Sequence, residues 1–512
     1  MRIDLTAKAI GLVLTYFSTA FLAPLTMALH AEDLESSLHF IVSCVITFAV
    51  GFTMYKATGK DLPFSTLKKK EALFIVAFSW ILTSIMASIP YLLRGIPFAD
   101  SIFEATSGIS TCGASVLSDL ESYPRSLLLW RSMTQWIGGL GIIVIFIAVL
   151  PQFAVAGRQM FFAESASPNR DKLAPRMQFN AINILVVYLI LTTAAIISLH
   201  IAGMPFFESV CNTFSMVSAG GLSPSSTSIS QYQGKPVAWV CIFFMFLSGV
   251  NFSLQYKLFF QRNAKSLLRS SEFIAYVVIV AISSFLIVVF ITLDADRITL
   301  PLIGENIKNA LFHSISIMTS TGFYTVNHDA WDAKAKIVLM LLMFVGASAG
   351  SAGGGIKVIR IIYAFKFLKR EFSLILHPKA VIPIKLDGRA VSESTGQQII
   401  SFIFFYFMFF AGTAALIAML EDNIYYGTIT SAVTIGNTGL GFDAFGPSGS
   451  FAGLTATSKI VLSLAMIIGR LELIPILVMF SPDYWKMAKR RKTADQDSGE
   501  GKRGSSKDGR KD

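Results

Sequence analysis

Apolar stretches of about twenty residues recur along this chain, and they constrain its fold more than any other feature. A helix of that length crosses the hydrocarbon core of a bilayer, where each backbone polar group must be satisfied inside the protein. Only 15% of the 512 residues are charged, against about 25% in an ordinary soluble domain. The pattern predicts an all-α polytopic membrane protein with spans near residues 9–29, 38–56, 72–93, 128–150, 180–203, 236–256, 273–293, 335–358, 396–420 and 457–480.

The net charge of +11 could indicate nucleic-acid binding, but the positions of the basic residues indicate membrane topology instead. Of the 43 Lys and Arg, 33 lie in segments that this arrangement of spans places on one side of the membrane. Such a bias marks the cytoplasmic side, so both termini are predicted to be cytoplasmic. The outer segments carry acidic residues, Glu104 and Glu208 among them, and an acidic vestibule would concentrate cations.

One short pattern occurs four times, each time after a predicted span: "FEATSGISTCGASV", "FESVCNTFSMVSAGGLS", "NIKNALFHSISIMTSTGFYT" and "NIYYGTITSAVTIGNTGLGF". Each copy is a moderately polar, helix-length stretch that ends in small residues and a glycine. The glycines are 108, 101 and 117 residues apart. Such repeats usually reflect pseudosymmetry around a shared site. The predicted division is a helix pair at 1–71, repeats at 72–178, 179–270, 271–394 and 395–490, and a disordered basic tail at 491–512.

The four copies predict helix–pore-loop–helix repeats around a central pore lined by backbone carbonyls. Rings of carbonyl oxygens can replace the hydration shell of a cation, and glycine permits the backbone conformation that this requires. Helix-breaking loops between spans are the alternative for any single copy, and four copies in register disfavour it. The predicted filter residues are Thr111, Cys112, Gly113, Ala219, Gly220, Gly221, Ser320, Thr321, Gly322, Asn437, Thr438 and Gly439.

A second small-residue segment, "MFVGASAGSAGGGIKVIR" at 343–360, interrupts the last helix of the third repeat. Close helix packing is the alternative explanation for such a sequence. Arg470 lies inside a predicted span, where an arginine is costly and indicates function, unless it forms a structural pair with Glu472. By pseudosymmetry Arg470 lies at the depth of this loop. We predict a gate made of Arg470 and a movable loop that contains Gly346, Gly350, Gly353, Gly354 and Gly355.

Other classes of function find little support in the sequence. The four Cys are scattered, and no HExxH motif, paired carboxylates or Ser/His constellation indicates an enzyme. "GSAGGGIK" does not fit a phosphate-binding P-loop, so nucleotide control would have to come from a partner. A sensor that binds potassium without conducting it stays open. His313 is expected to pack behind the filter rather than relay protons, and Cys112 is expected to be structural. The positive charge of the tail indicates attraction to anionic lipids and membrane topology, or else a surface that binds a partner protein.

The repeats, the single-glycine filters and "MIIGRLELIPIL" at 466–477 resemble the TrkH family, the membrane subunit of bacterial Trk potassium uptake systems. The resemblance covers residues 1 to about 490 and includes the extra helix pair before residue 72. In this superfamily, which includes TrkG, KtrB and HKT, each filter has one essential glycine. Some plant relatives carry serine in the first filter and accept sodium, so Gly113, together with the glycines of the other three filters, points to potassium and similar large cations.

The resemblance implies a multi-pass inner-membrane protein that transports K⁺, gated by the loop and Arg470, with no catalytic residue and no organic cofactor. It also implies a homodimer that docks on a TrkA-like cytosolic subunit, which binds NAD and adenine nucleotides, and no nucleic-acid partner. Symport of potassium with protons or sodium is the alternative mechanism. It would need a second cation site or a titratable group in the pathway, for which the sequence offers only Arg470 and Glu472 as candidates.

Overall fold

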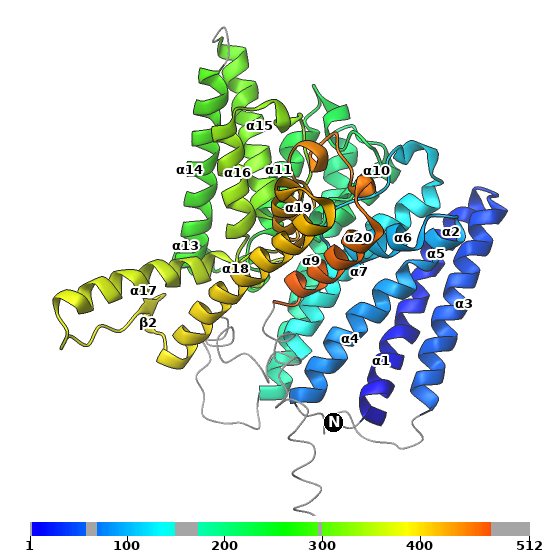
Figure 1. Ribbon diagram of the computed structural model, residues 1–512, viewed down its shortest axis with the longest axis horizontal. Coiled ribbons are helices and arrows are strands. Elements are labelled where there is room, and N and C mark those ends of the chain that lie inside the picture. The colour runs from blue at the N-terminus through cyan, green and yellow to red at the C-terminus, as the bar shows by residue number, and fades with distance from the viewer. Residues whose placement is uncertain (1–2, 58–68, 149–172, 295–298, 473–512) are drawn as a thin grey trace, which may run out of the picture.

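The computed structural model describes residues 3–57, 69–148, 173–294 and 299–472, and nearly all of its regular structure is helical (Figure 1). In this part of the chain the only strands are β1 (Lys385–Leu386) and β2 (Arg389–Ala390), which pair antiparallel. The all-α prediction is therefore confirmed. The predicted tail at 491–512 lies outside the described residues.

The N-terminal part is a helix pair that packs against the first repeat, at the edge of the molecule (Figure 1). It consists of α1 (Ile3–Ser18), the 3₁₀ turn η1 (Thr19–Phe21), α2 (Leu22–His30) and α3 (Leu34–Lys56). Gly11 and Gly51 face each other, and a Cβ on Gly51 would lie 2.7 Å from the backbone nitrogen of Thr15. Lipid offers no hydrophobic drive for helix association, so small residues that permit close backbone contact hold such pairs together. The ring of Trp130 stacks on Phe21 at 4.3 Å and joins the pair to the first repeat.

Four times, a long helix is followed by a helix whose C-terminal end lies near the centre of the molecule (Figure 1). The long helices are α4 (Lys69–Ala87, continued by α5, Ile89–Leu93), α9 (Leu173–Ile201), α14 (Ser271–Leu293) and α18 (Glu393–Glu421). The central helices, which we call pore helices, are α6 (Phe98–Ile109), α10 (Phe206–Val217), α15 (Leu300–Met318) and α19 (Ile424–Gly436). The predicted repeats after one extra helix pair are thus present.

The second helices of the repeats lie at the predicted spans 128–150, 236–256, 335–358 and 457–480, and two of the four are not continuous. Of the described helices, six stretches are long and apolar enough to cross a membrane alone, and they are the N-terminal pair and the first helix of each repeat. The second helices are α7 (Arg125–Ala148), α11 (Val237–Ser248) with α12 (Phe252–Phe259), α16 (Ala333–Val345) and α20 (Ala456–Arg470). Both α7 and α20 end close to residues that the structure does not describe. The other two are broken.

The break between α11 and α12 corrects the continuous span predicted at 236–256, because the two helices meet at 105°. The side chain of Asn251 starts α12 by accepting hydrogen bonds from the backbone nitrogens of Ser253 and Leu254, at 2.8 and 3.3 Å. Nε2 of Gln255 donates to the freed carbonyls of Leu247 and Val250, at 2.7 and 3.0 Å. The apolar composition that predicted a span is real, but capping side chains favour two short helices there.

The third repeat is interrupted between Val345 and Val358, where α16 ends and α17 (Val358–Leu376) begins. Figure 1 shows α17 leaving the molecule crosswise to the upright α14. The remaining short elements are α13 (Ala264–Leu268) and the 3₁₀ helices η3 (Leu120–Ser122), η6 (Ser230–Tyr232), η7 (His328–Ala330), η8 (Asp443–Phe445) and η9 (Phe451–Gly453).

Candidate ion pathway

The four pore helices end in the same way. In each, the first predicted filter residue has a left-handed backbone, with φ of 54° at Thr111, 57° at Ala219, 59° at Ser320 and 52° at Asn437. The next residue donates its backbone N–H to a carbonyl five residues back, from Cys112, Gly220, Thr321 and Thr438 to Ser107, Ser215, Ser316 and Val433, at 2.7 to 3.0 Å. A left-handed residue with such a back-bond is a common helix terminator. This terminator ends the pore helix at the corresponding position of all four repeats.

The glycine that follows is where each segment meets open space. Gly113, Gly221, Gly322 and Gly439 are partly exposed, whereas the two residues before each glycine and the one after it are buried. The backbone φ of these glycines lies between 70° and 89°, a region that residues with a side chain rarely adopt. The structure therefore brings all twelve predicted filter residues together, with only the glycines bordering the space between them.

The glycines also define a closed ring around the centre of the molecule. A Cβ on Gly113 would collide with the carbonyl oxygen of Gly220 in the second repeat. The same holds from Gly221 to Thr321, from Gly322 to Thr438, and from Gly439 back to Cys112. Each glycine is thus packed against the carbonyl of the next repeat, and the fourth repeat returns to the first. A ring of this kind has no room for a side chain at any of its four positions.

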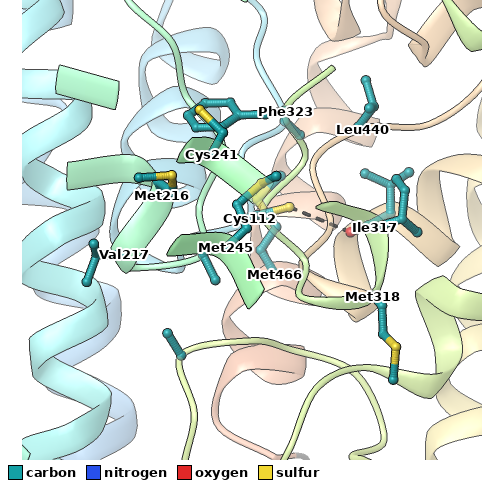
Figure 2. Packing of buried hydrophobic residues seen from close by; sticks show 14 of the residues in the cluster. Cys112, Met216, Val217, Cys241, Met245, Ile317, Met318, Phe323, Leu440 and Met466 are labelled. Carbon is teal, nitrogen blue, oxygen red and sulfur yellow. Dashed lines mark hydrogen bonds between the residues drawn. The ribbon is translucent and has the colours of Figure 1, made fainter. Parts of the chain in front are cut away.

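Apolar and sulfur-containing side chains fill the space behind the ring. Figure 2 shows Cys112, Met216, Ile317 and Met466 packed around the filter segments, within the large buried cluster that joins all four repeats. The thiol of Cys112 donates to the carbonyl of Val433 at 3.7 Å and so points away from the ring opening. This contact agrees with a structural role for Cys112.

The predicted gate loop lies against the inner ends of the third and fourth pore helices. The backbone nitrogen of Gly354 donates to Oγ of Ser320, a filter residue, at 2.6 Å. A Cβ on Gly353 would come within 2.7 Å of the carbonyl oxygen of Thr319, and one on Gly354 would collide with that of Gly436. The loop, which includes Gly346, Gly350 and Gly355 as well, therefore packs directly beneath the ring.

Arg470 reaches this loop from the end of α20. Its Nη1 donates to the carbonyl of Ala352 at 2.8 Å, and its side chain is only 3% exposed. Its Nε and Nη2 have no hydrogen-bond partner among the described residues. Glu472, the alternative partner considered from sequence, instead forms an ion pair with Arg360 at the start of α17. Arg470 thus brings positive charge to the space beneath the ring without a carboxylate partner in the described part of the chain.

Two charged residues of the loop region were not singled out from the sequence. Lys357, which ends the loop, is buried, has a φ of 82°, and donates from Nζ to the carbonyl of Gly353. Glu272, on α14, accepts a hydrogen bond from the backbone nitrogen of Ala349 at 2.6 Å. The sequence does carry a signal for Lys357, because it directly follows "GGGI". A loop of small residues leaves space in which a long side chain can be buried. Nothing in the sequence pairs Glu272 with the loop.

The prediction that Glu104 contributes to an acidic vestibule is wrong. Glu104 is fully buried on α6, where Oε1 accepts from Nε of Arg131 at 2.8 Å and Oε2 accepts from the backbone nitrogen of Val116 at 3.0 Å. Nη1 of Arg131 also donates to the carbonyl of Ser223 in the second repeat, at 3.0 Å. Because a buried carboxylate needs a partner, Glu104 holds the outer ends of two filter segments instead of attracting ions.

His313 occupies the corresponding place on the third pore helix. Its ring nitrogens lie 2.9 Å from the carbonyl oxygen of Asn309 and 3.2 Å from that of Val326. Its ring packs edge-on against Trp331 at 4.8 Å and against His328 at 5.3 Å. These contacts are those of a side chain that packs behind the filter, as the sequence predicted.

Residues 40–487 match the TrkH family, described as cation transport proteins. The chain belongs to the TrkH family. Its similar proteins include the Trk system potassium uptake protein TrkG of Escherichia coli (strain K12), 32% identical over 93% of this chain and 97% of the relative. The Trk system potassium uptake protein TrkH of Salmonella typhimurium is 31% identical over 95% of this chain and its own full length. Members of this family are transporters, so the chain is not an enzyme.

The fold is also similar to that of a solved structure. A crystal structure of the potassium transporter TrkH from Vibrio parahaemolyticus superposes with a TM-score of 0.86 at 26% sequence identity. The match covers 95% of this chain and 100% of the other. At that similarity the chain has the fold of that potassium transporter.

Proposed function

We propose that this protein takes up potassium across a bacterial inner membrane through the ring of Gly113, Gly221, Gly322 and Gly439. The observation that carries the proposal is the closure of this ring, in which each glycine packs on a carbonyl of the next repeat and alone borders the central space. Its similarity to proteins named as Trk potassium uptake proteins supports the choice of ion.

The ring would work by replacing the water around the ion with backbone oxygens. The four pore helices direct their C-terminal ends toward the ring, and these ends carry partial negative charge. A membrane potential of 100 mV is worth about 2.3 kcal/mol per charge, which drives roughly fiftyfold accumulation without a second ion. Uptake down the electrochemical gradient is therefore sufficient, and the residues that border the ring need not titrate.

The loop and Arg470 would close the pathway beneath the ring. The hydrogen bond from Gly354 to Ser320 holds the loop against the filter, and the one from Arg470 to Ala352 holds it against the fourth repeat. The Nε and Nη2 of Arg470, which have no hydrogen-bond partner among the described residues, add positive potential where a cation would leave. Opening then requires the loop to move away from both contacts.

Regulation would come from outside this chain. We infer a homodimer, with both termini in the cytoplasm, that binds a cytosolic nucleotide-binding subunit on the basic inner surface. In support, α17 carries Lys366, Lys369 and Arg370 together with exposed apolar residues such as Phe365 and Phe372, and it projects from the repeats (Figure 1). An exposed apolar helix with basic residues is typical of an interaction surface.

The test is cation flux into proteoliposomes that contain this chain alone, with K⁺ and Na⁺ compared and no proton gradient. Wild-type protein should pass K⁺ in preference to Na⁺, and Arg470→Ala should raise the K⁺ flux several-fold because the barrier beneath the ring is lost. The matched control is Arg94→Ala, which removes a peripheral arginine paired with Glu35 at 3.1 Å and should leave the flux unchanged.

Flux that appears only when a proton or sodium gradient is imposed would show coupled transport and would contradict the channel mechanism. Equal permeation of K⁺ and Na⁺ by the wild-type protein would contradict the proposed filter itself.

A further inference from the structure

The second filter segment differs from the others at the residue before its ring glycine. That residue is Gly220, where the other repeats have Cys112, Thr321 and Thr438. The three side chains are used. Oγ1 of Thr321 lies 2.8 Å from Oγ1 of Thr319, and the side chains of Thr438 and Cys112 both donate to the carbonyl of Val433, at 3.4 and 3.7 Å. Cys112 and Thr438 thus attach their filter segments to α19, and Thr321 is bonded to the residue that caps α15, whereas Gly220 has no side chain to make such a contact.

Gln135 occupies the space that the missing side chain leaves. It is fully buried on α7, in the first repeat. Its Nε2 donates to the carbonyl of Gly220 at 2.6 Å, and its Oε1 accepts from the backbone nitrogen of Leu222 at 3.0 Å. The amide of Gln135 is therefore hydrogen-bonded to the filter backbone on both sides of Gly221. The reverse orientation of the amide would place oxygen against oxygen, so the two contacts fix it.

The fit explains why position 220 is a glycine. A Cβ there would come within 2.5 Å of Cδ of Gln135 and 2.7 Å of both its amide nitrogen and its amide oxygen. Gly220 itself has no positive φ, so backbone freedom does not require a glycine at this position. The reason is the amide of a side chain that lies 85 residues earlier in the chain.

A second side chain, one turn earlier on the same helix face as Gln135, also contacts the second filter segment. Arg131 is held by its buried ion pair with Glu104 and donates to the carbonyl of Ser223, in the same filter segment that Gln135 grips. Residues four apart on a helix project from one face. One face of α7 therefore carries both contacts from the first repeat to the second filter segment.

We propose that Gln135 is a specificity-determining residue of the ring, which holds the carbonyl of Gly220 in place where the other repeats use their own side chains. This inference rests on the proposed potassium filter. A ring discriminates against the smaller Na⁺ when its oxygens cannot close in around it. With the hydrogen bonds of Gln135 removed, the second segment is free to shift, and the preference for K⁺ falls.

The experiment measures half-saturating concentrations of K⁺ and Na⁺ for flux through the full chain in proteoliposomes, so that their ratio is separated from the maximal rate. Gln135→Leu keeps the volume and removes both hydrogen bonds, and it should reduce K⁺/Na⁺ discrimination on the order of tenfold. Gln255→Leu is the matched control, because Gln255 is also buried and bonds backbone carbonyls, but at the α11–α12 break. It should leave the ratio unchanged.

A compensating pair supplies the second test. Gly220→Thr should abolish flux, because its side chain meets the amide of Gln135. Gln135→Ala with Gly220→Thr should recover flux and discrimination, because the second segment then carries the threonine of the third and fourth, with Ser218 where Thr319 pairs with Thr321. This pair decides the question if Gln135→Leu does not fold.

Two results overturn the inference while the proposed filter stands: wild-type discrimination in Gln135→Leu, or no recovery in the double variant. If the wild-type protein shows no preference for K⁺ over Na⁺, the proposed potassium filter is itself contradicted, and the inference about Gln135 loses its basis.

Discussion

The ion pair of Glu104 and Arg131 shows how single residues support a ring made of backbone. Their side chains are 0% and 2% exposed, and between them they contact Ser115, Val116 and Ser223. Two charges taken out of water are stable only while each satisfies the other. The pair therefore fixes the outer ends of the first two filter segments in one geometry.

Removing one partner should cost far more than removing a charge at the surface. Glu104→Ala leaves Arg131 buried and unpaired, and the expected loss is about 3–5 kcal/mol. Glu35→Ala is the control, because Glu35 is 65% exposed in its pair with Arg94 and should cost at most about 1 kcal/mol. The measurement is thermal unfolding of the purified protein in detergent. Equal midpoints for the two variants would show that the buried pair is not required.

At this scale, what could be predicted from the sequence depends on whether a requirement is local. The position of Gly322 was predictable because both the glycine that favours a left-handed turn and the fourfold pattern around it are visible in a short stretch of sequence. The contacts of Gln135 and Glu272 were not predictable, since their partners, Gly220 and Ala349, are distant in sequence and no pattern connects them. The prediction of an acidic vestibule includes Glu104 because its partner Arg131 lies 27 residues away and no local pattern connects the two.

At the scale of elements, the loop proposed as the gate is held by several parts of the molecule at once. Its backbone bonds to Ser248 and Gly249 at the α11–α12 break, from Ala352 and Ser348 at 3.2 and 3.1 Å. Glu272 holds it from α14. The break in α11–α12 is thus the place where the second repeat meets the loop, and a continuous helix there would not expose these carbonyls.

Loosening one of these attachments should open the pathway without the cytosolic partner. Glu272→Ala removes the acceptor for the Ala349 N–H and should raise basal K⁺ flux several-fold in proteoliposomes. Glu272→Gln keeps an oxygen in the same place and should leave the flux near wild type. If the two variants behave alike, the hydrogen bond to the loop does not hold the gate.

The broken helices also show why hydropathy alone overstated the spans. Residues 236–256 are apolar throughout their first half, and a length criterion cannot see the turn at Gly249 to Asn251. The break between α16 and α17 was predictable because its glycines are dense enough to weaken any helix, at about 1 kcal/mol each. A single capping asparagine gives a weaker signal than five glycines.

At the scale of the whole molecule, the N-terminal helix pair packs on the repeats and contributes no residue to the ring. Gly51→Leu would force α1 and α3 apart, since a side chain there meets the backbone of Thr15. We expect a lower thermal midpoint with unchanged K⁺/Na⁺ discrimination, measured by unfolding and by flux. A change in discrimination would show that the pair reaches the filter after all.

The fold itself was predicted from the sequence because a fourfold repeat leaves few arrangements for four similar units in a membrane. The order around the ring, in which each glycine contacts the next repeat, was not predictable, since it depends on how neighbouring segments pack. The asymmetry at Gly220 has the same origin. The four repeats support their filter segments with different side chains.

The central claim is that the four glycines form the selective part of the pathway, and one series of variants tests it most directly. Alanine replaces Gly113, Gly221, Gly322 and Gly439 one at a time, with Gly304→Ala as the control, because that glycine lies on α15 with nothing near the position of its Cβ. K⁺ and Na⁺ flux are compared in proteoliposomes. Each ring variant should lose K⁺ preference or flux, and Gly304→Ala should keep both. Wild-type selectivity in any ring variant would contradict the account.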